Sequence, residues 1–230
     1  MATALARSHI EAQRRLRLLA VANTERLWRA LPGYDRKDVP GWLEAILPLV
    51  SAAQRQSVAL TNAYLARALE RQPVGVNTER ILTSLRGDTD PATVYERPMI
   101  EVWTALGAGR SYESAVAAGM ARAAGSVAMD VQMAMRGTAG AVEQADDGVY
   151  GYQRVADGGA CEFCSAIDGA YVKSADAFAL HNNCGCGLEP LTEPHPRATR
   201  LPSGVAVHRH GELGAVLGSS EHSFTSQSDI

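Results

Sequence analysis

The placement of the cysteines is the feature that most constrains this chain. All four cysteines of the 230-residue sequence lie within 26 consecutive positions, with a histidine between the two pairs. They form a C-x₂-C pair followed by an H-x₂-C-x-C group. Such spacing puts two thiolates on one side of a tight loop, where one tetrahedral metal ion can bind both. The candidate ligands are Cys161, Cys164, His181, Cys184 and Cys186.

Zinc is the metal that we expect at these residues, because structural Zn²⁺ is held by four Cys and His ligands at about 2.0 to 2.3 Å. Five candidates compete for the four positions, and the spacing leaves open which four bind. The sequence has no H-E-x-x-H motif and offers five candidate ligands for four positions, which leaves none of the positions vacant. We therefore expect a structural zinc ion and no catalytic one.

Two other interpretations of the cysteines stay open. Two disulfides would suit an oxidising compartment, and four reduced cysteines could lie in a core. The first ten residues carry no cationic segment followed by an apolar stretch, so we expect no secretory signal and synthesis in the cytosol. That expectation favours the metal site, with disulfides formed after release from the cell as its main rival.

The first 145 residues have the composition of a helical region. Ala, Leu, Arg, Glu and Gln dominate, and most Gly and Pro residues fall between the periodic apolar segments. Asp90 followed by Pro91 is a strong helix start, because Asp accepts free N–H groups and Pro has none to leave unpaired. The pattern predicts helices at 3–30 and 40–71, a short one after Asn77, one at 91–107, and one from Ser111 that weakens at 137–140.

Beyond residue 145 the composition changes. Gly, aromatic and β-branched residues replace the Ala-rich pattern and predict short strands at 149–155 and 170–173. The last forty or so residues are rich in Pro, Gly and Ser and have little to bury. We therefore expect a mainly α fold in three parts: an elongated helical region at 1–145, a small α+β cap domain stapled by Cys and His at 146–191, and a flexible tail at 192–230.

Charge is distributed unevenly along the chain. Residues 1–72 hold 11 basic and 6 acidic side chains, and the remainder holds 11 basic and 19 acidic ones. Arginines crowd onto the first predicted helix, where like charges three or four positions apart destabilise an isolated helix by a few tenths of a kcal/mol each. They form either an ordinary solvated face or a face that docks on an acidic protein surface or DNA. The six are Arg7, Arg14, Arg15, Arg17, Arg26 and Arg29.

Four short blocks lie in the predicted cap: Tyr152 to Val155, the ACEFC block that ends at Cys164, Asp168 to Tyr171, and His181 to Cys186 followed by Pro190. Together they resemble the C-terminal signature of MuF-like phage minor head proteins, of the actinobacteriophage type. The helical region before them is also similar in pattern, with Tyr95 and Arg97 before one helix and an Ala-rich helix after it.

The resemblance implies a low-copy, structural minor capsid protein of a tailed bacteriophage. Such a protein is associated with the portal vertex and acts in head morphogenesis, DNA packaging or ejection. It would assemble in the host cytoplasm and reside inside the phage head of the virion, in contact with the portal protein, the major capsid protein or both, and with packaged DNA as a further partner. We expect no membrane partner, because no apolar run reaches the roughly 18 residues that a bilayer span requires.

Two other functions stay open. Related phage proteins are sometimes labelled capsid maturation proteases, but this chain has no G-x-S-x-G or zincin motif, so we expect no catalytic residues and no enzyme. A Ser–His relay assembled by the fold would restore the protease interpretation. His9 lies on the first predicted helix, where we expect a surface or interface role. A DNA-binding module that uses the basic front half is the weaker alternative.

Overall fold

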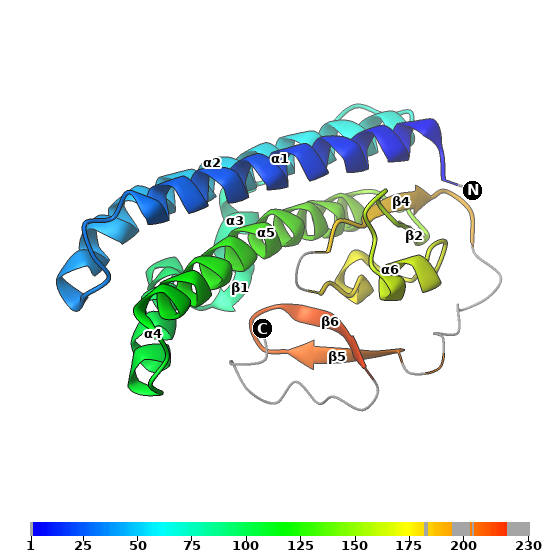
Figure 1. Cartoon of the computed structure of the whole chain (residues 1–230). Coiled ribbons are helices and arrows are strands. Elements are labelled where there is room, and N and C mark those ends of the chain that lie inside the picture. The colour runs from blue at the N-terminus through cyan, green and yellow to red at the C-terminus, as the bar shows by residue number, and fades with distance from the viewer. Residues whose placement is uncertain (1, 182–183, 195–202, 204, 220–230) are drawn as a thin grey trace.

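The computed structural model describes residues 2–181, 184–194, 203 and 205–219 (Figure 1). The N-terminal region is helical, as predicted. Helices α1 and α2 run side by side and both pack on α5, which also packs on α4. The elements are α1 (Ala4–Arg29), α2 (Val39–Ala68), α3 (Thr78–Ser84), α4 (Pro91–Gly107) and α5 (Tyr112–Ala145), with a 3₁₀ turn η1 (Arg36–Asp38) and an extended segment β1 (Leu85–Asp88).

The helices begin where the sequence offers capping side chains. The Thr3 hydroxyl accepts a hydrogen bond from the first turn of α1 at 3.1 Å, and the Asp90 carboxylate accepts one from the first turn of α4 at 3.0 Å. Asn77 and Ser111 cap α3 and α5 in the same way. Each cap pairs a backbone N–H that has no partner inside its helix. The predicted starts of these helices are therefore confirmed.

Helix α5 continues through Gly137 and Gly140 to Ala145, beyond the weak point predicted at 137–140. Glycines on this helix lie where neighbours approach closely. A Cβ on Gly137 would lie 3.1 Å from the Ile81 side chain of α3, and one on Gly119 would lie 2.6 Å from the Val102 side chain of α4. Tertiary packing thus outweighs the helix-propensity cost of Gly, which is about 1 kcal/mol.

The helical region has an apolar core of its own. Trp28 of α1 and Trp42 of α2 are fully buried and meet edge to face, with ring centroids 5.0 Å apart. The Trp28 indole N–H donates to the Val116 carbonyl, and that of Trp42 donates to the Tyr95 carbonyl. We call this cluster the helical core; further buried members include Leu16, Ile46, Val94, Met99, Val102 and Val127.

The predicted cap folds as a small antiparallel sheet. Its central strand is β2, which pairs with β3 on one side and with β4 on the other. The strands predicted at 149–155 and 170–173 are confirmed to within two residues, whereas β4 and α6 were not predicted. The elements are β2 (Gly151–Val155), α6 (Glu162–Ala166), β3 (Tyr171–Val172), the 3₁₀ turn η2 (Ala175–Ala177) and β4 (Gly187–Leu191).

A second apolar cluster, which we call the shared core, joins the cap to the helices. Ile10 of α1 and Met133 of α5 belong to it together with Tyr152 of β2 and Leu188 of β4. The Tyr152 hydroxyl also donates to a backbone carbonyl of α5 at 2.8 Å. The N-terminal half of α1 therefore packs on the cap, while Trp28 in its C-terminal half belongs to the helical core.

The structure corrects the prediction of a flexible tail for residues 205–219. These residues form an antiparallel hairpin of β5 (Val205–His210) and β6 (Gly214–Ser219). Strand β6 also pairs with Leu180 of the cap, whose carbonyl accepts from the Leu217 N–H at 2.6 Å. Leu213 and Val216 are buried in the shared core, so this segment has apolar groups to bury once α5 and the cap lie beside it. Residues 195–202, 204 and 220–230 of the predicted tail lie outside the described residues.

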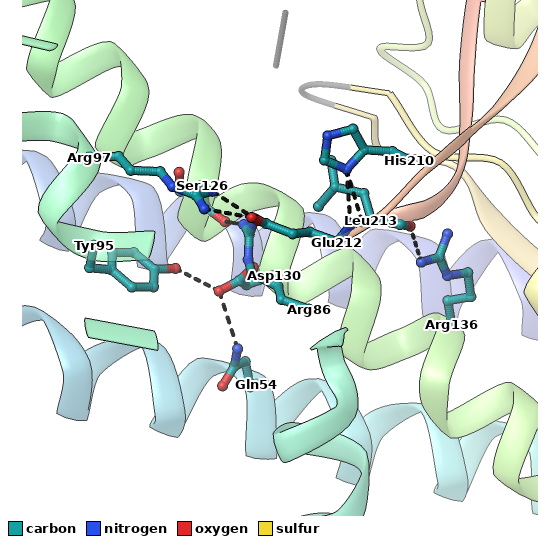
Figure 2. A network of polar contacts seen from close by, with 10 residues as sticks. All are labelled: Gln54, Arg86, Tyr95, Arg97, Ser126, Asp130, Arg136, His210, Glu212 and Leu213. Carbon is teal, nitrogen blue, oxygen red and sulfur yellow. Dashed lines mark hydrogen bonds and ion pairs between the residues drawn. The ribbon is translucent and has the colours of Figure 1, made fainter. Parts of the chain in front are cut away.

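A network of ion pairs holds the hairpin turn against the helices (Figure 2). The Glu212 carboxylate accepts two hydrogen bonds from Arg97 of α4, at 2.8 and 2.5 Å, and lies 3.5 Å from Arg86. Arg86 in turn pairs at 2.7 Å with Asp130, which accepts from the Tyr95 hydroxyl at 2.8 Å. Hydrogen bonding to Arg97 lowers the pKa of Glu212, so the carboxylate that fixes the turn is favoured in its charged form.

Candidate metal centre

The structure brings the five predicted ligands into two overlapping groups. Cys161 and Cys164 lie at the start of α6 and within it, while Cys184 and Cys186 lie in the loop that leads into β4. The His181 Nε2 lies 3.3 Å from the Cys161 Sγ and 2.9 Å from the Cys164 Sγ. The Cys164 Sγ lies 3.8 Å from the Cys184 Sγ. The C-x₂-C pair and the H-x₂-C-x-C group therefore face each other, as their spacing predicts.

Each group of three can hold a metal ion. Cys161, Cys164 and His181 form one group, and Cys164, Cys184 and Cys186 form the other. Within each group the ligand atoms all lie within 4.8 Å of one another, and Cys164 belongs to both. Two sulfurs bound to one tetrahedral zinc ion at about 2.3 Å lie about 3.8 Å apart, which matches the Cys164–Cys184 separation. The donor atoms fit a metal ion such as zinc beside Cys164.

The cysteines are free thiols, and three of them, Cys164, Cys184 and Cys186, are buried. The Cys164–Cys184 separation of 3.8 Å far exceeds a disulfide bond of about 2.05 Å. Hydrogen bonds from Cys164 and Cys186 hold the pKa of the Cys184 thiol well below its usual value, and the bond to Cys184 raises the pKa of Cys164. The arrangement thus favours a thiolate at Cys184, and a thiolate is the form of cysteine that binds a metal ion.

Arg154 supplies positive charge next to this cluster. Its guanidinium is buried, stacks on the Phe178 ring at 3.9 Å, and donates to the Ala179 carbonyl. The Nη1 atom has no hydrogen-bond partner among the described residues. The charge of Arg154 also acts to lower the pKa of Cys184, after the thiol hydrogen bonds. A zinc ion with three thiolates carries a net negative charge, which this buried cation would balance.

The backbone at Cys184, in the loop with Cys186, is held by hydrogen bonds from two residues that the sequence does not mark as part of the site. Arg17 Nη1 of α1 and Gln132 Nε2 of α5 both donate to the Cys184 carbonyl, at 2.9 and 2.7 Å. Arg17 also lies 3.6 Å from the Asp157 carboxylate, and its side chain is only 11% exposed. Nothing in the sequence marks Gln132, and Arg17 looks like any other arginine of its helix.

Four of the six arginines on α1 have acidic partners within the chain. Arg17 faces the cap, as described above. Arg14 and Arg15 pair with Glu11, and Arg29 pairs with Glu25. Acidic side chains of the chain itself therefore reduce the like-charge repulsion at these four positions.

Of the surface or interface role expected for His9, the structure corrects the surface part, because the side chain is buried inside the chain. Its ring is 6% exposed and stacks on Tyr64, with centroids 4.3 Å apart and planes 3° from parallel. Burial lowers the pKa of His9 to about 4. The apolar shared core around it therefore keeps the imidazole neutral.

None of the described helices combines the length and hydropathy of a bilayer-crossing segment.

Comparisons with known proteins identify a family for this chain, but they find no similar curated protein or solved structure. Neither the search of curated proteins nor that of solved structures finds a match. A family model described as VG15 protein matches residues 1–203. The match includes all five candidate ligands and most of the chain, which therefore belongs to the VG15 protein family.

Proposed function

We propose that this VG15-family chain is a structural minor capsid protein of a tailed bacteriophage, with a cap folded around one zinc ion. The observation that carries the proposal is that the residues of the resemblance and the candidate metal ligands lie in the same blocks of sequence. The blocks that resemble the MuF-like signature contain all the ligands that the structure gathers around Cys164. Those blocks would thus form a metal-stapled fold element, which suits a structural role.

The zinc ion would hold the two halves of the cap together. Ligands from α6 and from the loop before β4 would bind it, with Cys164 between the two groups. The cap has few large apolar side chains of its own, and small units of this kind need a metal or a similar staple to fold. When bound, zinc supplies cross-linking and no reaction chemistry in this proposal.

The proposed location is the portal vertex inside the phage head, reached during assembly in the host cytoplasm. The portal protein, the major capsid protein or both are the proposed partners, and packaged DNA is a further one. An exposed basic face on α1 suits an acidic protein surface, since the Arg15 and Arg29 side chains are 75% and 63% exposed. The pairing with Glu11 and Glu25 leaves this face with surplus positive charge.

The zinc part of the proposal is tested by elemental analysis of the purified full chain. We expect about one equivalent of zinc per chain, because one tetrahedral ion uses four of the five ligands. Thiol titration after metal removal should then find four free cysteines. Metal-free protein with no free thiols would instead indicate disulfides.

The capsid part is tested by locating the chain in purified virions. Quantitative mass spectrometry should find it at low copy number, and it should remain with the portal protein when heads are disassembled. Arg14→Glu with Arg15→Glu should reduce its incorporation into heads. Arg80→Glu with Arg110→Glu makes the same charge change at exposed sites away from α1 and should leave incorporation normal.

Two results would overturn this assignment in favour of the alternatives. Major capsid protein that stays uncleaved whenever the chain is missing, and is cleaved when purified chain is added, would indicate the maturation protease. Binding to DNA without portal protein, with an affinity that falls steeply with salt, would indicate a DNA-binding module.

A further inference from the structure

The carbonyl oxygen of Cys184 accepts hydrogen bonds from side chains of two helices. Arg17 of α1 donates to it at 2.9 Å and Gln132 of α5 at 2.7 Å. These residues are 167 and 52 positions away from Cys184 along the chain, so the two hydrogen bonds form only when the helices are docked on the cap. A carbonyl oxygen has two lone pairs, and both are used here.

The loop at this point has little room to move. Gly185 lies between the two cysteines, and a Cβ there would collide with the Asp157 carboxylate and lie 2.9 Å from Arg17 Nη2. Asp157 is itself paired with Arg17, and its side chain is 4% exposed. On the other side of Cys186, a Cβ on Gly187 would lie 2.5 Å from the Ile10 side chain of α1. Helix α1 thus contacts both ends of the ligand loop.

We propose that Arg17 and Gln132 are positioning residues, which hold the Cys184 carbonyl so that Cys184 and Cys186 face Cys164. Through Arg17, this contact couples metal binding to the docking of α1 on the cap. The inference rests on the proposed metal centre. Groups that orient metal ligands change metal affinity by about 10- to 100-fold when they are removed. Because coupling is reciprocal, metal binding tightens the contact of α1 with the cap by the same factor.

The positioning role is tested by metal binding to the full chain with Arg17→Met and Gln132→Leu, each of which removes the donor and keeps side-chain bulk. Competition with a chelator should show zinc affinity about 10- to 100-fold weaker in each variant. The matched control is Arg14→Met on the same helix, whose side chain is 41% exposed and pairs with Glu11. Arg17→Lys, which keeps a donor and the charge, should recover part of the affinity.

A spectroscopic reading separates positioning from simple loss of stability. Co²⁺ bound in place of zinc reports ligand geometry through its visible absorption. We expect that spectrum to change in Arg17→Met and Gln132→Leu and to be unaltered in Arg14→Met. Variants with control-like zinc affinity and an unaltered Co²⁺ spectrum would overturn the inference, even where their melting temperatures fall.

Hydrogen exchange of the unmutated chain tests the coupling without any variant. Zinc removal should speed exchange of the α1 amides between Ile10 and Arg17, while amides around Trp28 stay protected. Unchanged exchange over Ile10 to Arg17 would overturn the coupling alone. Wild-type chain that binds neither zinc nor Co²⁺ would instead remove the proposed metal centre, and this inference with it.

Discussion

The helical core and the cap side of the shared core are built from different side chains. The helical core is filled by large groups such as Trp28, Trp42 and Met99, each fully buried. The cap contributes Tyr152, Phe178 and Leu180 to the shared core, but also three cysteines. Burial of a large apolar side chain contributes about 1.5 to 3 kcal/mol, and a cysteine contributes less. The helical core is therefore stabilised by large packed side chains, whereas the cap, in the function proposed above, is stabilised by the bonds of its thiolates to zinc.

The two regions should lose stability by different routes. Damage to the helical core leaves a cavity, whose cost grows with the volume removed. In the proposed metal centre, loss of a ligand from the cap should cost a large part of the metal-binding free energy. The following variants, from the largest expected effect to the smallest, test this division.

Cys164→Ser should have the largest effect, because Cys164 belongs to both ligand groups. Structural zinc contributes on the order of 10 kcal/mol in small metal-folded units. The cap should therefore lose its fixed structure, while Trp fluorescence barely changes, because all three tryptophans lie in or against the helical core. Zinc content and fluorescence of the same sample are the measurements. A large fluorescence change would show that the helices depend on the cap.

Trp42→Ala should destabilise the helical core rather than the cap. It removes a fully buried indole, its edge-to-face contact with Trp28 and its hydrogen bond to the Tyr95 carbonyl. We expect a loss of about 3 to 5 kcal/mol in the free energy of unfolding, measured by urea titration of helical circular dichroism. Ile100→Ala, on an exposed side chain of α4, is the control and should cost far less. Equal losses for the two variants would contradict the packing account.

His9 makes the boundary between the regions sensitive to pH. Its pKa is about 4 in the folded chain and 6.5 ordinarily, so the unfolded chain binds more protons between those values. Stability therefore falls as the pH drops from 6.5 towards 4, by about 2 kcal/mol at pH 5. His9→Phe should lose less stability than the wild type between pH 7 and pH 5. Taking the difference between the two proteins removes the contribution of other titrating groups, and parallel pH profiles would refute the prediction.

Two glycine substitutions should change stability in opposite directions. Gly119→Ala places a methyl group 2.6 Å from Val102 and 2.7 Å from Trp28, so overpacking should cost about 1 to 3 kcal/mol. Gly41→Ala, in α2, meets nothing within 4 Å and should gain up to about 1 kcal/mol from helix propensity. Thermal melts of both variants provide the measurement. A gain at Gly119 would mean that the α4–α5 contact is looser than the structure shows.

The sequence predicts much of the helical region because helix formation is governed locally. Capping oxygens such as those of Thr3 and Asp90 act within one turn, and apolar periodicity extends over a few turns. The same holds for the candidate metal ligands, since C-x₂-C spacing alone places Cys161 and Cys164 on one tight turn. The prediction of the first helix, at 3–30, differs from α1 by one residue at each end.

The hairpin and its ion network were missed because their partners are remote. Glu212 pairs with Arg97, which is 115 positions away in the sequence. The hairpin segment is rich in Gly, His and Val, and its pattern of apolar and polar residues is too weak to predict a strand. Its burial depends on surfaces that α5 and the cap supply only after folding. The local composition therefore predicted a tail for this segment.

The residues themselves determined the helices, their starting points and the set of five metal-ligand candidates, because short-range geometry decides each of these. Only the tertiary structure decided that Arg17 turns inward, that Gln132 holds the Cys184 carbonyl, and that Cys164 joins two ligand groups. Side chains of one type are alike in sequence, and what distinguishes Arg17 from Arg14 is the surface it meets. That surface is made of segments from far along the chain, which no local pattern can place.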